Sequence, residues 1–154
     1  MFGFSIAFLI IVGLQILFLV ALLVAFYRKP RRLEATSTGV SVIVCAHDEE
    51  HNLRELVPLL LQQDYPDFEV IVVEDRSNDG TYDYLREMVP VHVRLKMVRV
   101  ESTPAHIHGK KFALTLGIRA ARYEWVLLTD ADCRPASTQW VREMSRGMAG
   151  DTQF

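Results

Sequence analysis

The sequence predicts an α/β fold, with a mostly parallel sheet and flanking helices, preceded by one N-terminal transmembrane helix. Three observations lead to this prediction. No charged side chain occurs before Arg28. Beyond residue 39, short apolar and β-branched runs alternate with segments of helical periodicity, as in parallel sheets with crossover helices. Polar and acidic residues follow three of these runs directly, at the sheet edge where such folds bind ligands.

Length and composition restrict the class of protein further. A chain of 154 residues provides one ordinary domain at most. A net charge of -2 gives no basic surface for nucleic acid, so we expect no nucleic-acid partner. Cys45 and Cys133 are too few for a disulfide framework and point to a reducing compartment.

The N-terminal stretch has the length and composition of a membrane span. Residues 6–26 are apolar apart from Gln15, and about 20 helical residues cross a bilayer core of about 30 Å. A signal peptide is the first alternative, but the chain start is not basic and the run is long. A buried core helix is the second, although such a helix need not be apolar on every face.

Basic residues follow the apolar stretch immediately, at positions 28, 29, 31 and 32. The positive-inside rule then places the following part of the chain in the cytoplasm. We therefore expect a single-pass membrane protein with a transmembrane helix over 1–27, a basic juxtamembrane linker over 28–39 and a globular part over 40–154.

The globular part is expected to contain four strands and four helices. Its apolar runs predict strands over 40–45, 68–73, 95–100 and 125–129. Helical spacing predicts helices over 49–63, 81–88, 110–121 and from just after Pro135 to about Met148, with Gly150 as a C-terminal cap. Pro58 predicts a kink in the first of these helices, or a late start.

Asp130 and Asp132 form the candidate metal site. Two carboxylates this close in sequence repel each other when both are charged, and a divalent cation between them removes the repulsion. Carboxylate oxygens suit Mg²⁺ or Mn²⁺ better than Zn²⁺, and Mg²⁺ often combines one or two carboxylates with substrate phosphates. The alternative is that Asp132 only caps a turn before Pro135.

The other strand ends offer further candidates, each with a structural alternative. Asp75 can accept from a nucleobase or a ribose hydroxyl, or it can serve as a turn residue. Glu49 and Glu50 either face a ligand or simply favour the start of a helix. Lys110 either reaches a phosphate or is solvated.

Two further patterns argue against other kinds of site. The first turn lacks the glycines of a dinucleotide or P-loop site. His106 and His108 lack a third ligand nearby, so we expect no metal there.

In combination these segments resemble the family 2 glycosyltransferases, which are inverting enzymes with a GT-A fold. Five blocks carry the resemblance over residues 40–150. The family's strand followed by Pro-Ala-Tyr-Asn-Glu is matched by residues 42–49, and its Gln-x-Tyr-Pro turn by residues 63–66. The remaining blocks are the acidic turn ending in Asp-Gly-Thr, the Gly-Lys helix and the strand with Asp-x-Asp, at residues 73–81, 109–117 and 127–132.

The resemblance implies a site for a nucleotide-diphosphate sugar, with a UDP-sugar as the first expectation, and a Mn²⁺ or Mg²⁺ cofactor. By position, Asp75 would hydrogen-bond the base and Lys110 would lie near the nucleoside and the diphosphate. Asp130 would contact the ribose or sugar, and Asp132 would bind the metal. The nucleoside pocket would be lined by Cys45, Ala46, His47 and Glu49, and Ala131 belongs to the Asp-x-Asp block.

The resemblance also implies what lies elsewhere. In the family the general base follows the metal motif in a later acceptor-binding segment, so we expect it beyond Phe154. We thus interpret the chain as the donor-binding half of a membrane enzyme that builds polysaccharide or glycolipid, apparently truncated and inactive alone. An inactive membrane-tethered nucleotide-sugar-binding module is the alternative. A haloacid-dehalogenase phosphatase, which also uses Asp-x-Asp, is disfavoured because its motif lies on the first strand.

Overall fold

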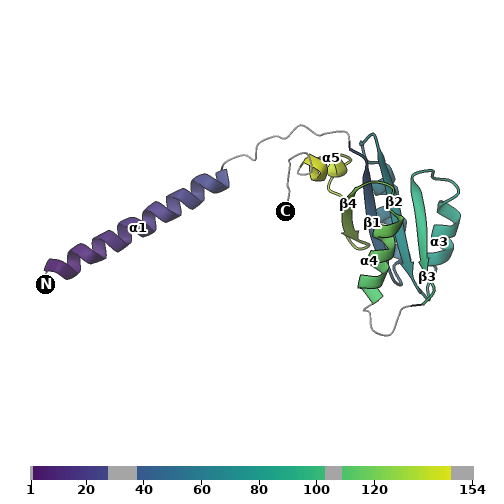
Figure 1. The fold of residues 1–154 in the computed structure, drawn as a ribbon, viewed down its shortest axis with the longest axis horizontal. Helices are drawn as coiled ribbons and strands as arrows, with labels where there is room; N and C mark the ends of the chain where they lie inside the picture. The colour runs from purple at the N-terminus through teal and green to yellow at the C-terminus, as the bar shows by residue number, and fades with distance from the viewer. Residues whose placement is uncertain (1, 28–37, 103–108, 147–154) are drawn as a thin grey trace. The chain divides into compact units, whose positions relative to one another are not determined.

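The computed structural model describes residues 2–27, 38–102 and 109–146, and the chain divides into two units near residue 32. The first unit contains helix α1 (Phe2–Tyr27; Figure 1). Most of the large apolar side chains that the structure describes in this helix are exposed. Within the described residues, no helix combines the length and apolar character needed to cross a membrane. The predicted transmembrane helix is therefore not confirmed, and residues 28–37 of the predicted linker lie outside the described ranges.

The second unit is built on a four-stranded parallel sheet, as predicted. Its strands are β1 (Val40–Ala46), β2 (Phe68–Asp75), β3 (Leu95–Val100) and β4 (Trp125–Asp130). They lie in the order β3-β2-β1-β4, and every neighbouring pair is parallel. The two central strands are buried almost throughout, which explains why their sequences are mostly apolar rather than alternating. The exceptions are Ser41, Glu69 and the acidic end of β2.

Helices cover both faces of this sheet (Figure 1). Side chains of α2 (Glu50–Leu61), α3 (Thr81–Met88) and α5 (Trp140–Ser145) share one core cluster with Val42, Val44 and Val72. Helix α4 (Gly109–Ala120) covers the opposite face, where Ala113 packs in a second cluster with Ile43, Ile71 and Val73.

Gly117 sets how closely α4 approaches the sheet. A Cβ atom there would lie 2.7 Å from Cγ2 of Ile43 and 2.9 Å from Cγ2 of Val73, closer than carbon atoms pack. The glycine therefore lets α4 lie directly on β1 and β2, which brings the start of that helix to the carboxyl edge of the sheet.

Of the two alternatives that Pro58 predicts, a kink or a late start, the late start is wrong, because helix α2 begins at Glu50 and includes Pro58. The predicted start of the last helix is also wrong. Helix α5 begins at Trp140 rather than just after Pro135, and the described part of it ends at Ser145. The backbone between Pro135 and Trp140 makes hydrogen bonds outside a helix. Thr138 O accepts from Asp64 N at 2.8 Å, and Ser137 O accepts from the Gln63 side-chain amide at 3.0 Å. The proposed cap at Gly150 lies outside the described residues.

Candidate functional site

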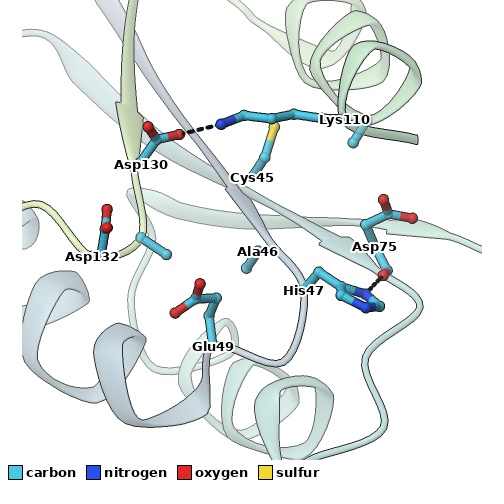
Figure 2. A pocket seen from close by; sticks show the side chains of 10 residues that line it. Cys45, Ala46, His47, Glu49, Asp75, Lys110, Asp130 and Asp132 are labelled. Carbon is cyan, nitrogen blue, oxygen red and sulfur yellow. Dashed lines mark hydrogen bonds and ion pairs between the residues drawn. The ribbon is translucent and has the colours of Figure 1, made fainter. Parts of the chain in front are cut away.

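A pocket of about 280 Å³ opens at the carboxyl ends of β1, β2 and β4, beside the start of α4 (Figure 2). The structure brings all nine candidate donor-site residues around it: Cys45, Ala46, His47, Glu49, Asp75, Lys110, Asp130, Ala131 and Asp132. The tenth lining residue, Ala113, escaped the sequence analysis. Its position three residues after Lys110 places it on the same face of α4, which is the signal that would have found it.

Two turns follow β1 and β2 beside the pocket, and in each of them a residue other than glycine adopts the left-handed conformation. Asp48 has a φ of 56° just after β1, and Arg76 has a φ of 54° just after β2. The turns are bonded to each other: Asn78 N donates to Asp48 Oδ1 at 2.6 Å, and Asp48 N donates to Ser77 Oγ at 3.1 Å. This mutual bonding offsets the cost of the two backbone conformations.

The start of α2 is fixed by the same pair of turns. Glu49 N donates to Thr81 Oγ1 at 3.0 Å, and Glu50 N donates to Asp79 Oδ2 at 3.0 Å. Burial raises the pKa of the Asp79 carboxyl, but hydrogen bonds from Thr81 and from the Glu50 backbone outweigh this and leave the pKa lowered. Asp79 is thus a structural residue: its carboxylate accepts from the first backbone N–H of α2, at Glu50, and of α3, at Thr81.

Asp75 and His47 form the side of the pocket opposite Asp130 (Figure 2). The Asp75 side chain is only 11% exposed, and its Oδ1 accepts from Arg76 Nε at 2.8 Å. His47 Nδ1 lies 2.6 Å from the Asp75 carbonyl oxygen. Because a carbonyl can only accept, His47 Nδ1 carries a proton, and its exposed ring presents a flat face at the pocket rim.

Lys110 and Asp130 face each other across the other side of the pocket. Lys110 Nζ donates to Asp130 Oδ1 at 2.9 Å, and both side chains are well exposed. The hydrogen bond from Asp130 and its charge raise the pKa of Lys110. Asp130 therefore has a cationic partner in the protein itself, which the sequence reasoning did not foresee when it assigned charge neutralisation to a metal ion alone.

Asp132 and Glu49 lie together on the remaining side, with their carboxylates toward the pocket (Figure 2). Within the described ranges, no group of three or more His, Cys, Asp or Glu side chains is arranged to hold a metal ion. The candidate ligand set contains two carboxylates, and Mg²⁺ or Mn²⁺ commonly completes such a set with substrate phosphates and water. The oxygen chemistry of Asp132 and Asp130 fits such an ion.

Cys45 lies between these two sides of the pocket. Burial raises the pKa of its thiol, and the nearby charge of Lys110 opposes this only partly. A neutral thiol at this position makes the centre of the pocket less polar than its acidic rim.

Comparison with known proteins identifies the class. The model of Glycosyl transferase family 2 matches residues 41–152. A poly-beta-1,6-N-acetyl-D-glucosamine synthase of Staphylococcus epidermidis is 32% identical over 94 residues, which are 61% of this chain and 22% of that protein. A beta-monoglucosyldiacylglycerol synthase of Trichormus variabilis is 29% identical over 133 residues, 82% of this chain and 28% of the relative.

Solved structures of glycosyltransferases share the fold. The mannosyltransferase PcManGT from Pyrobaculum calidifontis, in complex with GDP-Man and Mn²⁺, superposes with a TM-score of 0.67 at 29% identity, over 81% of this chain and 37% of that one. S. aureus TarS in complex with UDP-GlcNAc superposes with a TM-score of 0.55 at 29% identity, and the match covers 70% of this chain and 30% of TarS.

The parallel sheet and its acidic carboxyl edge thus define a domain of the glycosyltransferase class. The chain belongs to glycosyltransferase family 2. It spans between a fifth and a third of the length of the two curated relatives described above.

Proposed function

We propose that this chain is the donor-binding part of a metal-dependent glycosyltransferase that transfers a sugar, with inversion, from a nucleotide-diphosphate sugar to a polysaccharide or lipid-linked acceptor. The observation that carries the proposal is the pocket itself. Nine residues from four separate segments of the family pattern surround one cavity, and they include a cation, a nearly buried carboxylate and two exposed carboxylates.

Each part of the pocket suits one part of a nucleotide-diphosphate sugar. The Asp75 carboxylate is held by Arg76 through one oxygen, so its other oxygen is available to the imide N–H of a uracil. The His47 ring offers a face on which a base can stack. Lys110 is exposed, and its ammonium could exchange the Asp130 carboxylate for a diphosphate oxygen.

Asp132, with Asp130, would hold the Mn²⁺ or Mg²⁺ ion. When bound, the ion would supply charge stabilisation for the departing nucleoside diphosphate. The protein's own contribution on this side is Lys110, whose charge assists the same leaving group. Inversion requires one displacement by an acceptor hydroxyl activated by a general base. We place that base outside the residues that line this pocket.

Attachment to a membrane through α1, with the globular part in the cytoplasm, belongs to the proposal as well. Its support is the uncharged sequence of α1, its exposed apolar side chains and the basic residues that follow. Against it stands the finding that none of the described helices has both the length and the apolar character needed to cross a membrane. Carbonate extraction of membranes from cells that express the chain decides the matter: release into the alkaline supernatant contradicts integral attachment.

The donor-site proposal is tested by calorimetric titration of the full chain, in mild detergent, with UDP, GDP and dTDP in the presence of Mn²⁺. We expect UDP to bind and Asp132→Asn to abolish the Mn²⁺ dependence. Glu124→Asn, which alters an exposed acidic residue away from the pocket, is the control. A folded chain that binds none of the three nucleotides contradicts the proposal, whereas binding without sugar transfer favours the inactive binding module.

A further inference from the structure

The segment that follows β4 carries Asp132 but belongs to no helix or strand. It turns immediately after the sheet, where Cys133 N donates to Asp130 O at 3.2 Å. Ala131 is buried, whereas Asp132 and Cys133 are exposed. A side chain that binds a metal ion needs a fixed backbone, and one turn hydrogen bond provides little constraint.

The Arg134 guanidinium restrains the backbone of this turn through further hydrogen bonds, without lining the pocket. Its Nη1 donates to the carbonyl oxygens of Ala131 at 3.1 Å and Cys133 at 2.8 Å, the two residues that flank Asp132. Both carbonyls are therefore held by one planar group, and the peptide units on either side of Asp132 are oriented together.

The same guanidinium is bonded to helix α2 by its other nitrogens. Nε and Nη2 donate to Glu55 Oε2 at 3.1 and 2.8 Å, and Nη2 also donates to Asn52 Oδ1 at 2.9 Å. Neighbouring positions on α2, Leu53 and Leu56, are fully buried in the core. The turn is thus tied to a helix that the hydrophobic core holds in place.

Asn52 extends this connection to the pocket. While its Oδ1 accepts from Arg134, its Nδ2 donates to Glu49 Oε2 at 2.6 Å. The carboxylates of Glu49 and Asp132, on one side of the pocket, are therefore positioned through a single chain of contacts. Arg134 itself does not line the pocket, so it acts on the site through these neighbours.

We propose that Arg134 is the positioning residue of the Asp132 turn, and that through Asn52 and Glu55 it sets the geometry in which Asp132 meets a divalent cation. This inference rests on the proposed donor site. The hydrogen bond and charge of Arg134 also hold the pKa of Glu55 below its usual range. Outer groups of this kind commonly change metal affinity by about ten- to a hundredfold when removed.

The test measures UDP affinity of the full chain by calorimetry as a function of Mn²⁺ concentration. For Arg134→Gln we expect the Mn²⁺ concentration at half-maximal effect to rise about tenfold, with metal-free UDP binding unchanged. Arg134→Lys should be impaired to a similar extent, since an ammonium keeps the charge but loses the planar fork. Glu55→Gln, which removes the charge of the anchor and preserves the contacts of Arg134 to the turn, should show a smaller rise, about threefold.

Arg142→Gln is the matched control. Arg142 also joins the part of the chain after β4 to the end of α2, through Asp64 O at 3.0 Å, but it touches neither the turn nor the pocket. Unchanged Mn²⁺ dependence in Arg134→Gln, or an equal rise in Arg142→Gln, overturns the inference while leaving the donor site intact. Absence of UDP binding in the unmodified chain instead overturns the donor site, and the inference with it.

Discussion

Lys110 and Asp130 form an ion pair across the mouth of the pocket, with 2.9 Å between Nζ and Oδ1. Lys110 comes from the first turn of α4 and Asp130 from the end of β4, so two elements meet at this contact. Without a nucleotide, each residue satisfies the charge that the other would offer to a ligand. Binding of a diphosphate with a metal ion therefore requires an exchange of partners.

This exchange predicts opposite effects of one substitution on two ligands. Lys110→Met frees Asp130, so Mn²⁺ should bind two- to fivefold more tightly in the absence of nucleotide, roughly the range of exposed ion pairs. UDP should bind more weakly, because the diphosphate loses a cation. Lys111→Met is the control, since Lys111 is exposed and does not line the pocket. Titration calorimetry measures both ligands, and parallel changes in the two affinities contradict the exchange.

Arg76 provides a second prediction, because it combines a left-handed backbone with a side-chain bond to Asp75. Glycine adopts this backbone conformation without strain, so Arg76→Gly should leave the melting temperature unchanged or higher. The Asp75 carboxylate loses its orienting donor, so UDP affinity should fall about threefold, within the range of one exposed ion pair.

Titration of Arg76→Gly with pyrophosphate, a ligand that has no base, distinguishes an effect on base recognition from an effect on phosphate binding. Its affinity should not change in Arg76→Gly, because Arg76 acts on Asp75 rather than on the phosphate side of the pocket. Arg119→Gln, which removes an exposed charge from the end of α4, controls for net charge. Equal loss of UDP and pyrophosphate affinity would mean that Arg76 does not act through the base.

The parallel sheet was predictable because β1 and β2 are buried on both faces, and burial of that kind leaves a mostly apolar run in the sequence. The site residues were predictable as a group because parallel strands end at one edge of the sheet. The residues that hold these site residues in place through hydrogen bonds were not predictable. Arg134 contacts Asn52 and Glu55 at a sequence separation of about 80 residues, and no local pattern encodes such a contact.

The ends of helices were predicted less well for a related reason. The segment after Pro135 has apolar residues at helical spacing, yet its first carbonyls bond to Gln63 and Asp64 at the end of α2. A tertiary contact therefore determines where α5 begins. The Lys110–Asp130 pair was missed because each residue was considered for a ligand and not for the other.

Cys45 gives a third prediction, which concerns access to the pocket. Burial raises the pKa of its thiol, so less thiolate is present at pH 8 than for an exposed cysteine. Iodoacetamide should therefore label Cys133, which is exposed, faster than Cys45. In Cys133→Ser, where Cys45 alone reacts, UDP with Mn²⁺ should slow labelling several-fold. Mass spectrometry follows the modification, and labelling of Cys45 that is indifferent to UDP contradicts its place in the nucleotide pocket.

Glu69 provides a prediction about acid stability, at the opposite end of the sheet from the pocket. It is buried, and it accepts from Ser41 Oγ at 2.7 Å, from Arg122 N at 2.6 Å and from Lys96 Nζ at 2.7 Å. Burial alone raises the pKa of this carboxyl, but the hydrogen bonds outweigh it and leave the pKa below its ordinary value of 4.5.

A lowered pKa in the folded state means that Glu69 stabilises the fold above pH 4.5 and that this contribution is lost as the pH falls through the folded-state pKa. Glu69→Gln should therefore reduce the free energy of unfolding by about 1–3 kcal/mol at pH 7, because it weakens bonds to a buried charged acceptor. The difference from the unmodified chain should shrink towards pH 3. Urea unfolding across this pH range measures it, with the exposed Glu124→Gln as the control. A difference that stays constant with pH would show that packing, rather than the charge of Glu69, stabilises this end of the sheet.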